Sequence, residues 1–308
     1  MKKASIKIFF SDPDFVGWPM QLKIRDILSR HYSIEYSERP DFLFYSCYGT
    51  QFKTYDRCVK IYYTGENVSP NFNDCDYAIG FDYMNFEERY LRYEPVYSYI
   101  RDCIELRKNI DRSLASRKFC NFIYSKQNEE EGTLLRRDFC NALAHYKKVD
   151  CPGIILNNMR DAIEPRSGNW IQGKLDFIKN YKFTIAFENT FSRGYVTEKI
   201  MHAFMTNSIP VYYGDPEVQR MFNPKAFVNV RSFKIFDEVI EKIKQLDNDD
   251  DLYLEMLREP MINDLSQLEY DERLEKFLLN IIDRGNKPFY HARKYLPEER
   301  YRVKLFKY

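Results

Sequence analysis

Charged side chains gather in the segment FENTFSRGYVTEK, between two apolar runs. Glu188, Arg193, Glu198 and Lys199 fall within twelve positions. The preceding run, FTIAFEN (183–189), has the composition of a buried strand, and VTEKIMHAFM (196–205) has the apolar spacing of a helix. Because α/β sheets bind ligands beyond the carboxyl ends of their strands, these charges are expected at a ligand site.

The first turn of the predicted helix holds a cation where the helix dipole disfavours one. Backbone N–H groups in a first turn lack helical partners and, with the dipole, favour an anion. Lys199 fits this place if a phosphate faces it, and Glu198 could accept hydrogen bonds from two ribose hydroxyls. Tyr195 adds a hydroxyl donor. Spacing alone equally allows Glu198 to stabilise the helix end and Lys199 to be solvated.

Other patterns of phosphate or metal sites are weaker. The run GNWIQGKL (168–175) has the spacing of a phosphate loop, but Leu175 stands where Ser or Thr would hold magnesium. Asp12 and Asp14 are spaced like a metal-binding pair, although this spacing is more typical of a turn. The acidic run DNDDD (247–251) is expected to be a solvated loop. With seven cysteines, no C-x-x-C pair and scattered histidines, we expect no bound metal and no disulfide framework.

Charge and hydropathy limit the partners and the compartment. The 47 Lys and Arg nearly balance the 46 Asp and Glu, which argues against a nucleic-acid partner. The start of the chain is a poor signal peptide, and the cysteine usage indicates a reducing compartment, so we expect a cytoplasmic protein. The basic, aromatic segment 285–308 could contact the inner membrane surface, or it could be solvated or pack back on the body.

Short strands alternate with helical stretches in two series, which meet in the polar segment 101–117. This pattern predicts two α/β domains with parallel sheets, residues 1–112 and 113–284. A basic tail, residues 285–308, would follow them. The expected strands are 5–10, 32–37, 41–47, 59–65, 76–81, 118–125, 183–189, 208–214 and 226–230. The expected helices are 18–30, 132–146, 196–205 and 236–246.

The charged segment resembles the donor-binding signature of the α1,3/4-fucosyltransferases of glycosyltransferase family 10, in particular short bacterial members that act on lipopolysaccharide. The matching residues are Phe187-Glu188-Asn189, Tyr195-Val196-Thr197-Glu198-Lys199 and Gly214-Asp215-Pro216. The run YTGENVSPNFNDCDYAIGFD (63–82) extends the resemblance to the first domain. It implies the GT-B arrangement, two Rossmann-like domains facing a cleft, with GDP-fucose as the donor.

The resemblance also implies roles for individual residues. Glu198 would bind the ribose of GDP, Lys199 and Tyr195 would bind the diphosphate, and Asn189 would belong to the donor site. The family uses an arginine from an earlier helix against the phosphates. Aligning on RRDFCNAL (136–143) makes this Arg136, and the neighbouring Arg137 stays open as the alternative. Arg193 lies in the variable loop and receives no family role.

The general base is expected in the first domain. The family often reads G-E-N-E-S-P there, and this chain reads Gly65-Glu66-Asn67-Val68-Ser69-Pro70. Because Val68 replaces the second glutamate, Glu66 is the candidate base. It follows the strand VKIYYTG at its carboxyl end, where a capping or solvated role is the alternative.

The predicted activity is inverting transfer of L-fucose from GDP-β-L-fucose to O3 or O4 of N-acetylglucosamine in lactosamine-type glycans of bacterial surface polysaccharide. No cofactor is expected, because cations of the chain would stabilise the leaving diphosphate. Asp12, Asp14 and Trp18 are the candidate acceptor-binding residues, with Trp18 as a core anchor the alternative. The rival functions are a transferase of another GDP-sugar, such as GDP-mannose, and an inactive nucleotide-binding protein of the same fold.

Overall fold

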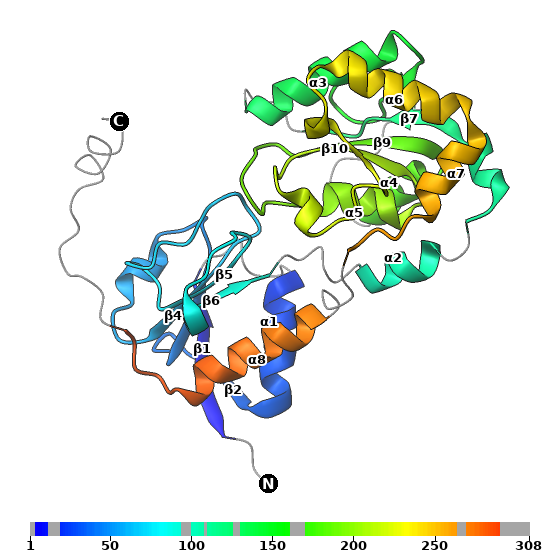
Figure 1. Cartoon of the computed structure of the whole chain (residues 1–308). Coiled ribbons are helices and arrows are strands. Elements are labelled where there is room, and N and C mark those ends of the chain that lie inside the picture. Colours follow the sequence, from blue (N-terminus) through cyan, green and yellow to red (C-terminus); the bar gives the residue numbers. More distant parts are fainter. Residues whose placement is uncertain are drawn as a thin grey trace. The chain divides into compact units, whose positions relative to one another are not determined.

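The computed structural model describes residues 4–11, 19–93, 100–107, 110–125, 130–160, 170–263 and 269–289. It divides into two units, each built on its own sheet (Figure 1). The first unit consists of residues 1–80, 85–91 and 274–308, and the second of residues 81–84 and 92–273.

The first unit contains a six-stranded sheet in the order β2-β1-β3-β4-β5-β6. The pairings from β2 to β5 are parallel. β3 and β5 are wholly buried, because they are uninterrupted apolar runs of the kind that parallel sheets cover on both faces. The strands are β1 (Ser5–Phe10), β2 (Ser33–Tyr36), β3 (Phe42–Tyr45), β4 (Val59–Tyr63), β5 (Tyr77–Gly80) and β6 (Tyr90–Arg92). Two short 3-10 helices, η2 (Gln51–Thr54) and η3 (Glu87–Arg89), lie in the connections.

Two helices far apart in sequence pack together in the first unit. α1 (Pro19–His31) and α8 (Tyr270–Asp283) lie side by side (Figure 1). His31 Nε2 lies 2.6 Å from Glu275 Oε1, and Tyr32 donates a hydrogen bond to Asp283 at 2.8 Å. Most of α8 therefore belongs to the first unit, whereas the sequence places it in the second domain. Sequence order could not indicate this, because the contacts cross more than 240 positions.

The segment after α8 runs along the amino-terminal edge of the first sheet. Asn286 Nδ2 donates a hydrogen bond to Asp41, just before β3, and the Phe289 backbone N–H donates to Asp76, just before β5, both at 2.6 Å. The Arg89 guanidinium lies 4.4 Å from the Phe289 ring centroid. Residue 289 therefore lies at the amino-terminal ends of the strands, whereas Glu66 follows the carboxyl end of β4.

The second unit contains a five-stranded parallel sheet in the order β11-β10-β9-β7-β8. The central strand, β9, is buried at all seven positions. The strands are β7 (Lys118–Asn121), β8 (Val149–Asp150), β9 (Tyr181–Phe187), β10 (Ile209–Tyr213) and β11 (Val228–Asn229). The helices are α2 (Ile100–Leu106), α3 (Glu131–Ala144), α4 (Trp170–Ile178), α5 (Glu198–Met205), α6 (Phe236–Asn248) and α7 (Asp250–Arg258). The short 3-10 helices are η6 (Arg112–Ser116), η7 (Val218–Arg220) and η8 (Val230–Ser232).

Helices cover both faces of the second sheet, with α3 and α6 on one side and α4 and α5 on the other (Figure 1). The expected strands and helices of both units recur within a few residues of their predicted bounds. The prediction of two Rossmann-like α/β domains with parallel sheets is confirmed. Gly173 and Lys174 lie inside α4, which excludes a phosphate loop at these two residues.

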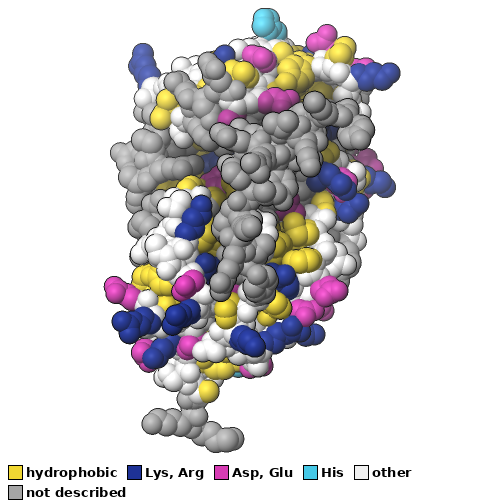
Figure 2. Space-filling view, turned by 90° about the vertical axis from the view of Figure 1, so that its left-hand side faces the viewer, with side chains coloured by type: hydrophobic (Ala, Val, Ile, Leu, Met, Phe, Trp, Pro, Cys, Tyr) yellow, Lys and Arg dark blue, Asp and Glu magenta, His cyan; other side chains and the backbone are white. Residues whose placement is uncertain are grey.

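The prediction that the acidic run 247–251 is a solvated loop is wrong. The Asp247 side chain is only 3% exposed and forms ion pairs with Lys182 at 3.3 Å and Lys147 at 2.9 Å. Asp249 caps α7 by accepting hydrogen bonds from the N–H groups of residues 251 and 252. A buried lysine needs a buried counter-ion, which the local sequence does not reveal. Elsewhere, on the face shown in Figure 2, charged side chains of both signs are interspersed, in keeping with the net charge of +1.

Candidate active site

The carboxyl ends of β9 and β10 lie side by side and form the base of the site. Phe187, the last residue of β9, pairs with Tyr213, the last residue of β10. Glu188 and Asn189 follow β9 directly, and Gly214 follows β10. The connection 190–197 then leads from β9 into α5, so the charged segment occupies the sheet edge predicted for it.

Gly194 allows the connection to turn sharply. Its φ of +89° is a conformation that residues with a Cβ rarely adopt, and a Cβ there would also collide with the carbonyl oxygen of Phe81. Arg92 Nη2 donates a hydrogen bond to the Gly194 carbonyl oxygen at 3.1 Å, and Arg92 Nε donates to that of Phe81 at 2.9 Å. These contacts fix the connection on the segment around Phe81.

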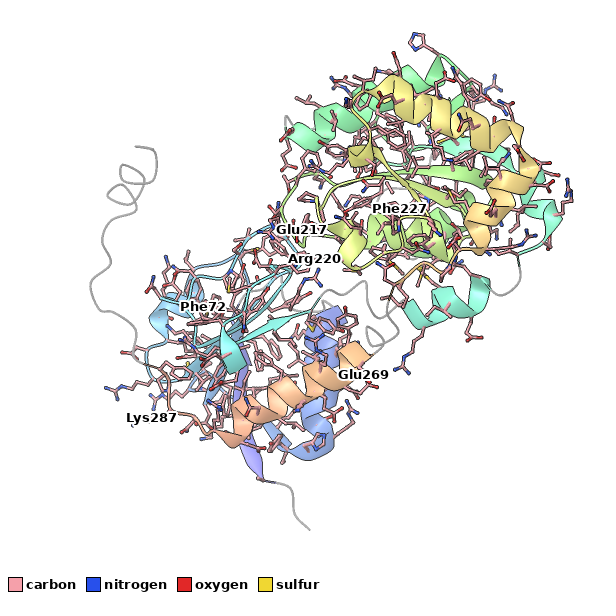
Figure 3. The ribbon with its side chains drawn as sticks, viewed as in Figure 1. Phe72, Glu217, Arg220, Phe227, Glu269 and Lys287 are labelled. Carbon is pink, nitrogen blue, oxygen red and sulfur yellow. The ribbon has the colours of Figure 1, made fainter. Side chains whose placement is uncertain are left out.

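Arg193 lies at the outside of the connection. Its guanidinium is 2.5 Å from a carboxylate oxygen of Glu217, which also pairs with Arg220 at 2.7 Å. Glu217 and Arg220 lie together on the turn after β10 (Figure 3). The Arg193 side chain is 65% exposed, so this cation supports the loop and is not enclosed in the site.

Glu188 is the centre of a buried hydrogen-bond network. It is 0% exposed. Its Oε1 accepts a hydrogen bond from the Thr197 backbone N–H at 2.8 Å, and its Oε2 accepts from the Thr197 hydroxyl at 2.7 Å and from Lys199 Nζ at 2.9 Å. Burial would lower the pKa of Lys199, but the negative charges of Glu188 and Glu198 outweigh it and raise this pKa above its usual value. Lys199 is therefore a stable cation with a buried counter-ion.

Arg136 and Asn189 form a second pair beside this network. Arg136 Nη1 donates a hydrogen bond to Asn189 Oδ1 at 2.5 Å, and its guanidinium lies 4.0 Å from the ring centroid of Tyr124. Arg136 is fully buried, whereas its neighbour Arg137 is exposed. Desolvation lowers the pKa of Arg136. Of the two candidate arginines, Arg136 is the one that contacts the carboxyl end of β9.

The amino-terminal end of α5 has no side-chain cap from its N-cap residue. Thr197 occupies the N-cap position, but its side chain makes no capping hydrogen bond, because its hydroxyl points to Glu188 and Lys199. Glu198 begins the helix with its side chain 40% exposed. Burial would raise the pKa of Glu198, but Lys199 and Lys174 outweigh this effect and hold the pKa below its usual value. An ionised carboxylate thus stands beside uncapped N–H groups.

The Tyr195 side chain is largely enclosed. It is 5% exposed, and its ring packs edge-on against Phe81 with centroids 5.1 Å apart. Val196 next to it is fully buried. The hydrophobic flanks of the motif therefore anchor the connection, while Glu198 and Lys199 carry its charges.

Glu66 lies in the first unit, at the carboxyl end of β4. Its side chain is exposed, and its Oε1 accepts a hydrogen bond from the Tyr48 hydroxyl at 2.5 Å. Its backbone N–H donates to the Thr64 hydroxyl at 2.9 Å. Sequence reasoning missed Tyr48, because the contact joins the loops after two neighbouring strands.

Several predictions concern residues outside the described part of the chain. These are Asp12, Asp14, Trp18 and the tail from residue 290 onward. Within the described ranges, no group of three or more His, Cys, Asp or Glu side chains could hold a metal ion. None of the described helices has both the length and the apolar character needed to cross a membrane.

Sequence reasoning also gave no role to two residues that shape the site. Glu188 was recognised only as part of the motif, although a charged residue ending an otherwise apolar strand is a signal for a buried ion pair. Gly132 donates its N–H to the Asn189 carbonyl oxygen at 3.1 Å, and a Cβ there would collide with the carbonyl oxygens of Glu188 and Asn189. A glycine in the first turn of a predicted helix was the available signal.

Comparison with known proteins connects this geometry to one family. The FucT N-terminal domain of α-(1,3)-fucosyltransferases matches residues 5–100, and the C-terminal domain of glycosyltransferase family 10 matches residues 115–259. The α-(1,3)-fucosyltransferase FucT of Helicobacter pylori is 36% identical over 273 residues, covering 79% of this chain and 57% of that protein. The chain thus spans little more than half the length of this curated relative.

Two solved structures extend the similarity over almost the whole chain. A crystal structure of an α1,3-fucosyltransferase with GDP-fucose matches with a TM-score of 0.75 at 28% identity, covering 95% of this chain and 94% of that one. A crystal structure of an α1,3-fucosyltransferase with GDP matches with a TM-score of 0.71 at 30% identity, covering 93% and 94%. With both halves matched by family models and the donor-site motif placed at the end of β9, the chain belongs to glycosyltransferase family 10, the fucosyltransferase family.

Proposed function

We propose that this protein transfers L-fucose from GDP-β-L-fucose, with inversion, to O3 or O4 of N-acetylglucosamine in a lactosamine-type glycan. The observation that carries the proposal is the amino-terminal end of α5, which has no side-chain cap and holds Glu198 and Lys199 in its first turn. Two phosphates and a ribose diol need cations, N–H donors and a carboxylate, and this edge of β9 supplies all three. The similar structure with bound GDP-fucose supports the choice of donor.

The donor would bind through its diphosphate. Lys199 and the uncapped N–H groups of α5 would face the phosphates, and Glu198 would accept hydrogen bonds from the ribose hydroxyls. Arg136 holds the side-chain oxygen of Asn189. The NH₂ group of Asn189 would then donate a hydrogen bond to GDP-fucose. Tyr195 would also bind the diphosphate through its hydroxyl, while its enclosed ring anchors the connection.

Charge develops on the GDP leaving group as the bond to fucose breaks. Lys199, Arg136 and the dipole of α5 would stabilise that charge from fixed positions, which is the most effective form of electrostatic catalysis. We therefore propose that the enzyme needs no metal cofactor. Activity that is unchanged after incubation with excess EDTA would support this, and a loss restored by one divalent metal would refute it.

Glu66 is our candidate for the general base. Its carboxylate is exposed at the carboxyl end of β4, so an acceptor hydroxyl could reach it, and the Tyr48 hydroxyl holds one of its oxygens. Deprotonation would let the acceptor oxygen attack the anomeric carbon through an oxocarbenium-like transition state.

The acceptor and the cellular setting are proposed on sequence grounds. Asp12, Asp14 and Trp18 would contact the acceptor sugar, and the natural acceptor would be a lactosamine-type glycan of a bacterial surface polysaccharide. The enzyme would work in the cytoplasm, with the basic tail contacting the inner membrane surface.

The test is a transfer assay followed by linkage analysis. The protein is incubated with GDP-fucose and either a type 1 or a type 2 lactosamine acceptor, and the linkage in the product is determined. We expect fucose on O4 of N-acetylglucosamine for the first acceptor or on O3 for the second. Transfer from GDP-mannose instead would identify a different GDP-sugar enzyme. Tight GDP binding without transfer to either acceptor would indicate an inactive member of the fold.

A further inference from the structure

We propose that Glu188 is a positioning residue, which holds the Lys199 ammonium in the orientation that binds the donor diphosphate before any nucleotide arrives. The inference rests on the proposed function, because it assigns the diphosphate to Lys199. It adds a residue that touches neither donor nor acceptor and acts through Lys199 and the start of α5.

The hydrogen-bond pattern around Glu188 can be satisfied only by a carboxylate. All three partners act as donors toward it: the Thr197 N–H, the Thr197 hydroxyl and Lys199 Nζ. A glutamine would turn its NH₂ group toward a donor on one side or the other. The Thr197 hydroxyl links the two side chains, because it donates a hydrogen bond to Glu188 and accepts one from Lys199 at 2.8 Å.

This network uses two of the three N–H donors of Lys199. An ammonium group has three N–H donors, and two are used by Glu188 and Thr197. Within the described residues the third has no hydrogen-bond acceptor, and the nearest further carboxylate oxygen, on Glu198, lies 3.6 Å away. One N–H donor of Lys199, in the first turn of α5, is thus left for a ligand.

The surroundings of Glu188 are shaped to admit its side chain. A Cβ on Gly214 would lie 2.6 Å from Glu188 Cγ, so only glycine leaves room there. A Cβ on Gly132 would collide with the Glu188 carbonyl oxygen. Gly214 therefore leaves room for the Glu188 side chain and Gly132 for the backbone that carries it, independently of the hydrogen bonds of the carboxylate.

A buried counter-ion also makes the site preformed. A buried, unpaired lysine would shift or lose its charge, whereas Glu188 keeps Lys199 cationic and ordered in the empty enzyme. Binding then loses less side-chain entropy, and the ammonium is already in place when charge develops on the leaving group.

The test is a double-mutant cycle with Glu188→Gln and Lys199→Met, measured as the dissociation constant of GDP by calorimetry and as kcat and KM for GDP-fucose. Glu188→Gln should weaken GDP binding about 10- to 100-fold, in the range of one charge-assisted hydrogen bond. In the Lys199→Met background the same change should have an effect below about 3-fold, because its target is gone. Asp247→Asn is the matched control: it also removes a buried carboxylate paired with a lysine in this unit, and it should leave GDP binding unchanged.

The outcomes separate the inference from the proposed function. If Lys199→Met does not weaken GDP binding, the diphosphate assignment itself is wrong. If Lys199→Met weakens binding but Glu188→Gln does not, or if the two effects multiply, only the role of Glu188 is refuted. Should Glu188→Gln fail to fold, Thr197→Val removes the bridging hydroxyl at constant shape. That variant should weaken GDP binding about 3- to 10-fold, while normal binding would overturn the inference.

Discussion

Arg136 Nη1 donates a hydrogen bond to Asn189 Oδ1 at 2.5 Å, and this contact decides which way the Asn189 amide faces. Because the oxygen is held by a buried guanidinium, the NH₂ group points away from Arg136. The NH₂ group of Asn189 is thus left for a partner other than Arg136, which we propose to be the diphosphate of the donor. Glu188 and Asn189, neighbours in sequence, each hold one cation of the site.

The orientation of Asn189 predicts unequal effects of two substitutions. Asn189→Ala removes the donor and should weaken GDP binding about 3- to 30-fold, the range of one hydrogen bond to a charged group. Asn189→Asp keeps the contact to Arg136 but presents an anionic oxygen to the phosphates, so it should weaken binding further. Calorimetric titration with GDP measures both. Equal or tighter binding by Asn189→Asp would contradict the orientation.

Arg136 and Arg137 provide an internal control for this prediction. Arg136→Ala should weaken GDP binding about 10- to 100-fold, because both a cation and the support of Asn189 are lost. Arg137→Ala removes an exposed cation from the same helical turn and should have no effect beyond about 2-fold. Reversed results would move the phosphate contact to Arg137.

Glu66 can be tested as the base without disturbing the donor site. Glu66→Gln should leave the dissociation constant of GDP within about 2-fold and lower kcat by about 10²- to 10⁴-fold, the usual contribution of a general base. Tyr48→Phe removes the hydroxyl that holds the carboxylate and should lower kcat by a smaller factor of about 3 to 30. Glu87→Gln, an exposed glutamate of the same unit, serves as the control. Near-normal turnover of Glu66→Gln would rule out this assignment.

The strands and most helices of both units could be predicted because they follow from local pattern. The run FTIAFEN is apolar throughout, and it forms the fully buried β9. The apolar spacing after Thr197 forms α5, with Glu198 and Lys199 in its first turn as expected. Apolar runs and helical spacing are patterns among residues close in sequence, so they can be read from a single sequence.

The partners of charged residues could not be predicted in the same way. The sequence predicts that Lys199 faces a phosphate or solvent, but it does not indicate that Glu188, eleven positions earlier, also holds the ammonium. Asp247 was expected in a solvated loop, but it is buried against Lys182. These contacts depend on which strand ends meet in space, which the sequence does not show. The packing of α8 on α1 could not be predicted for the same reason.

The burial of His202 predicts that the protein loses stability in mild acid. Burial, and next the positive charge of Lys174, lower the pKa of His202 to about 3, although Glu198 opposes the shift. Between its usual pKa of 6.5 and that value, the unfolded chain binds a proton that the folded chain does not, so stability falls as pH falls. The expected loss from pH 7 to pH 5 is about 2 kcal/mol.

Urea unfolding at several pH values measures this effect. His202→Gln should flatten the pH dependence by about that amount, whatever its own stability at pH 7. His145→Gln, a substitution of an exposed histidine at the end of α3, should not flatten it. A curve for His202→Gln parallel to that of the unsubstituted protein would contradict the assignment of a neutral buried histidine.

The basic tail predicts binding to anionic membranes. The full chain should sediment with phosphatidylglycerol vesicles but not with phosphatidylcholine vesicles, and binding should weaken as salt rises, because each Lys or Arg near such a surface contributes about 1 kcal/mol. Replacing Arg300, Arg302 and Lys304 by Gln should therefore weaken binding about 100-fold. The matched control replaces Lys225, Lys234 and Arg258, exposed cations of the second unit. If the control weakens binding as much as the tail variant, the attraction comes from net charge rather than from the tail. Equal binding to both kinds of vesicle would refute the electrostatic contact altogether.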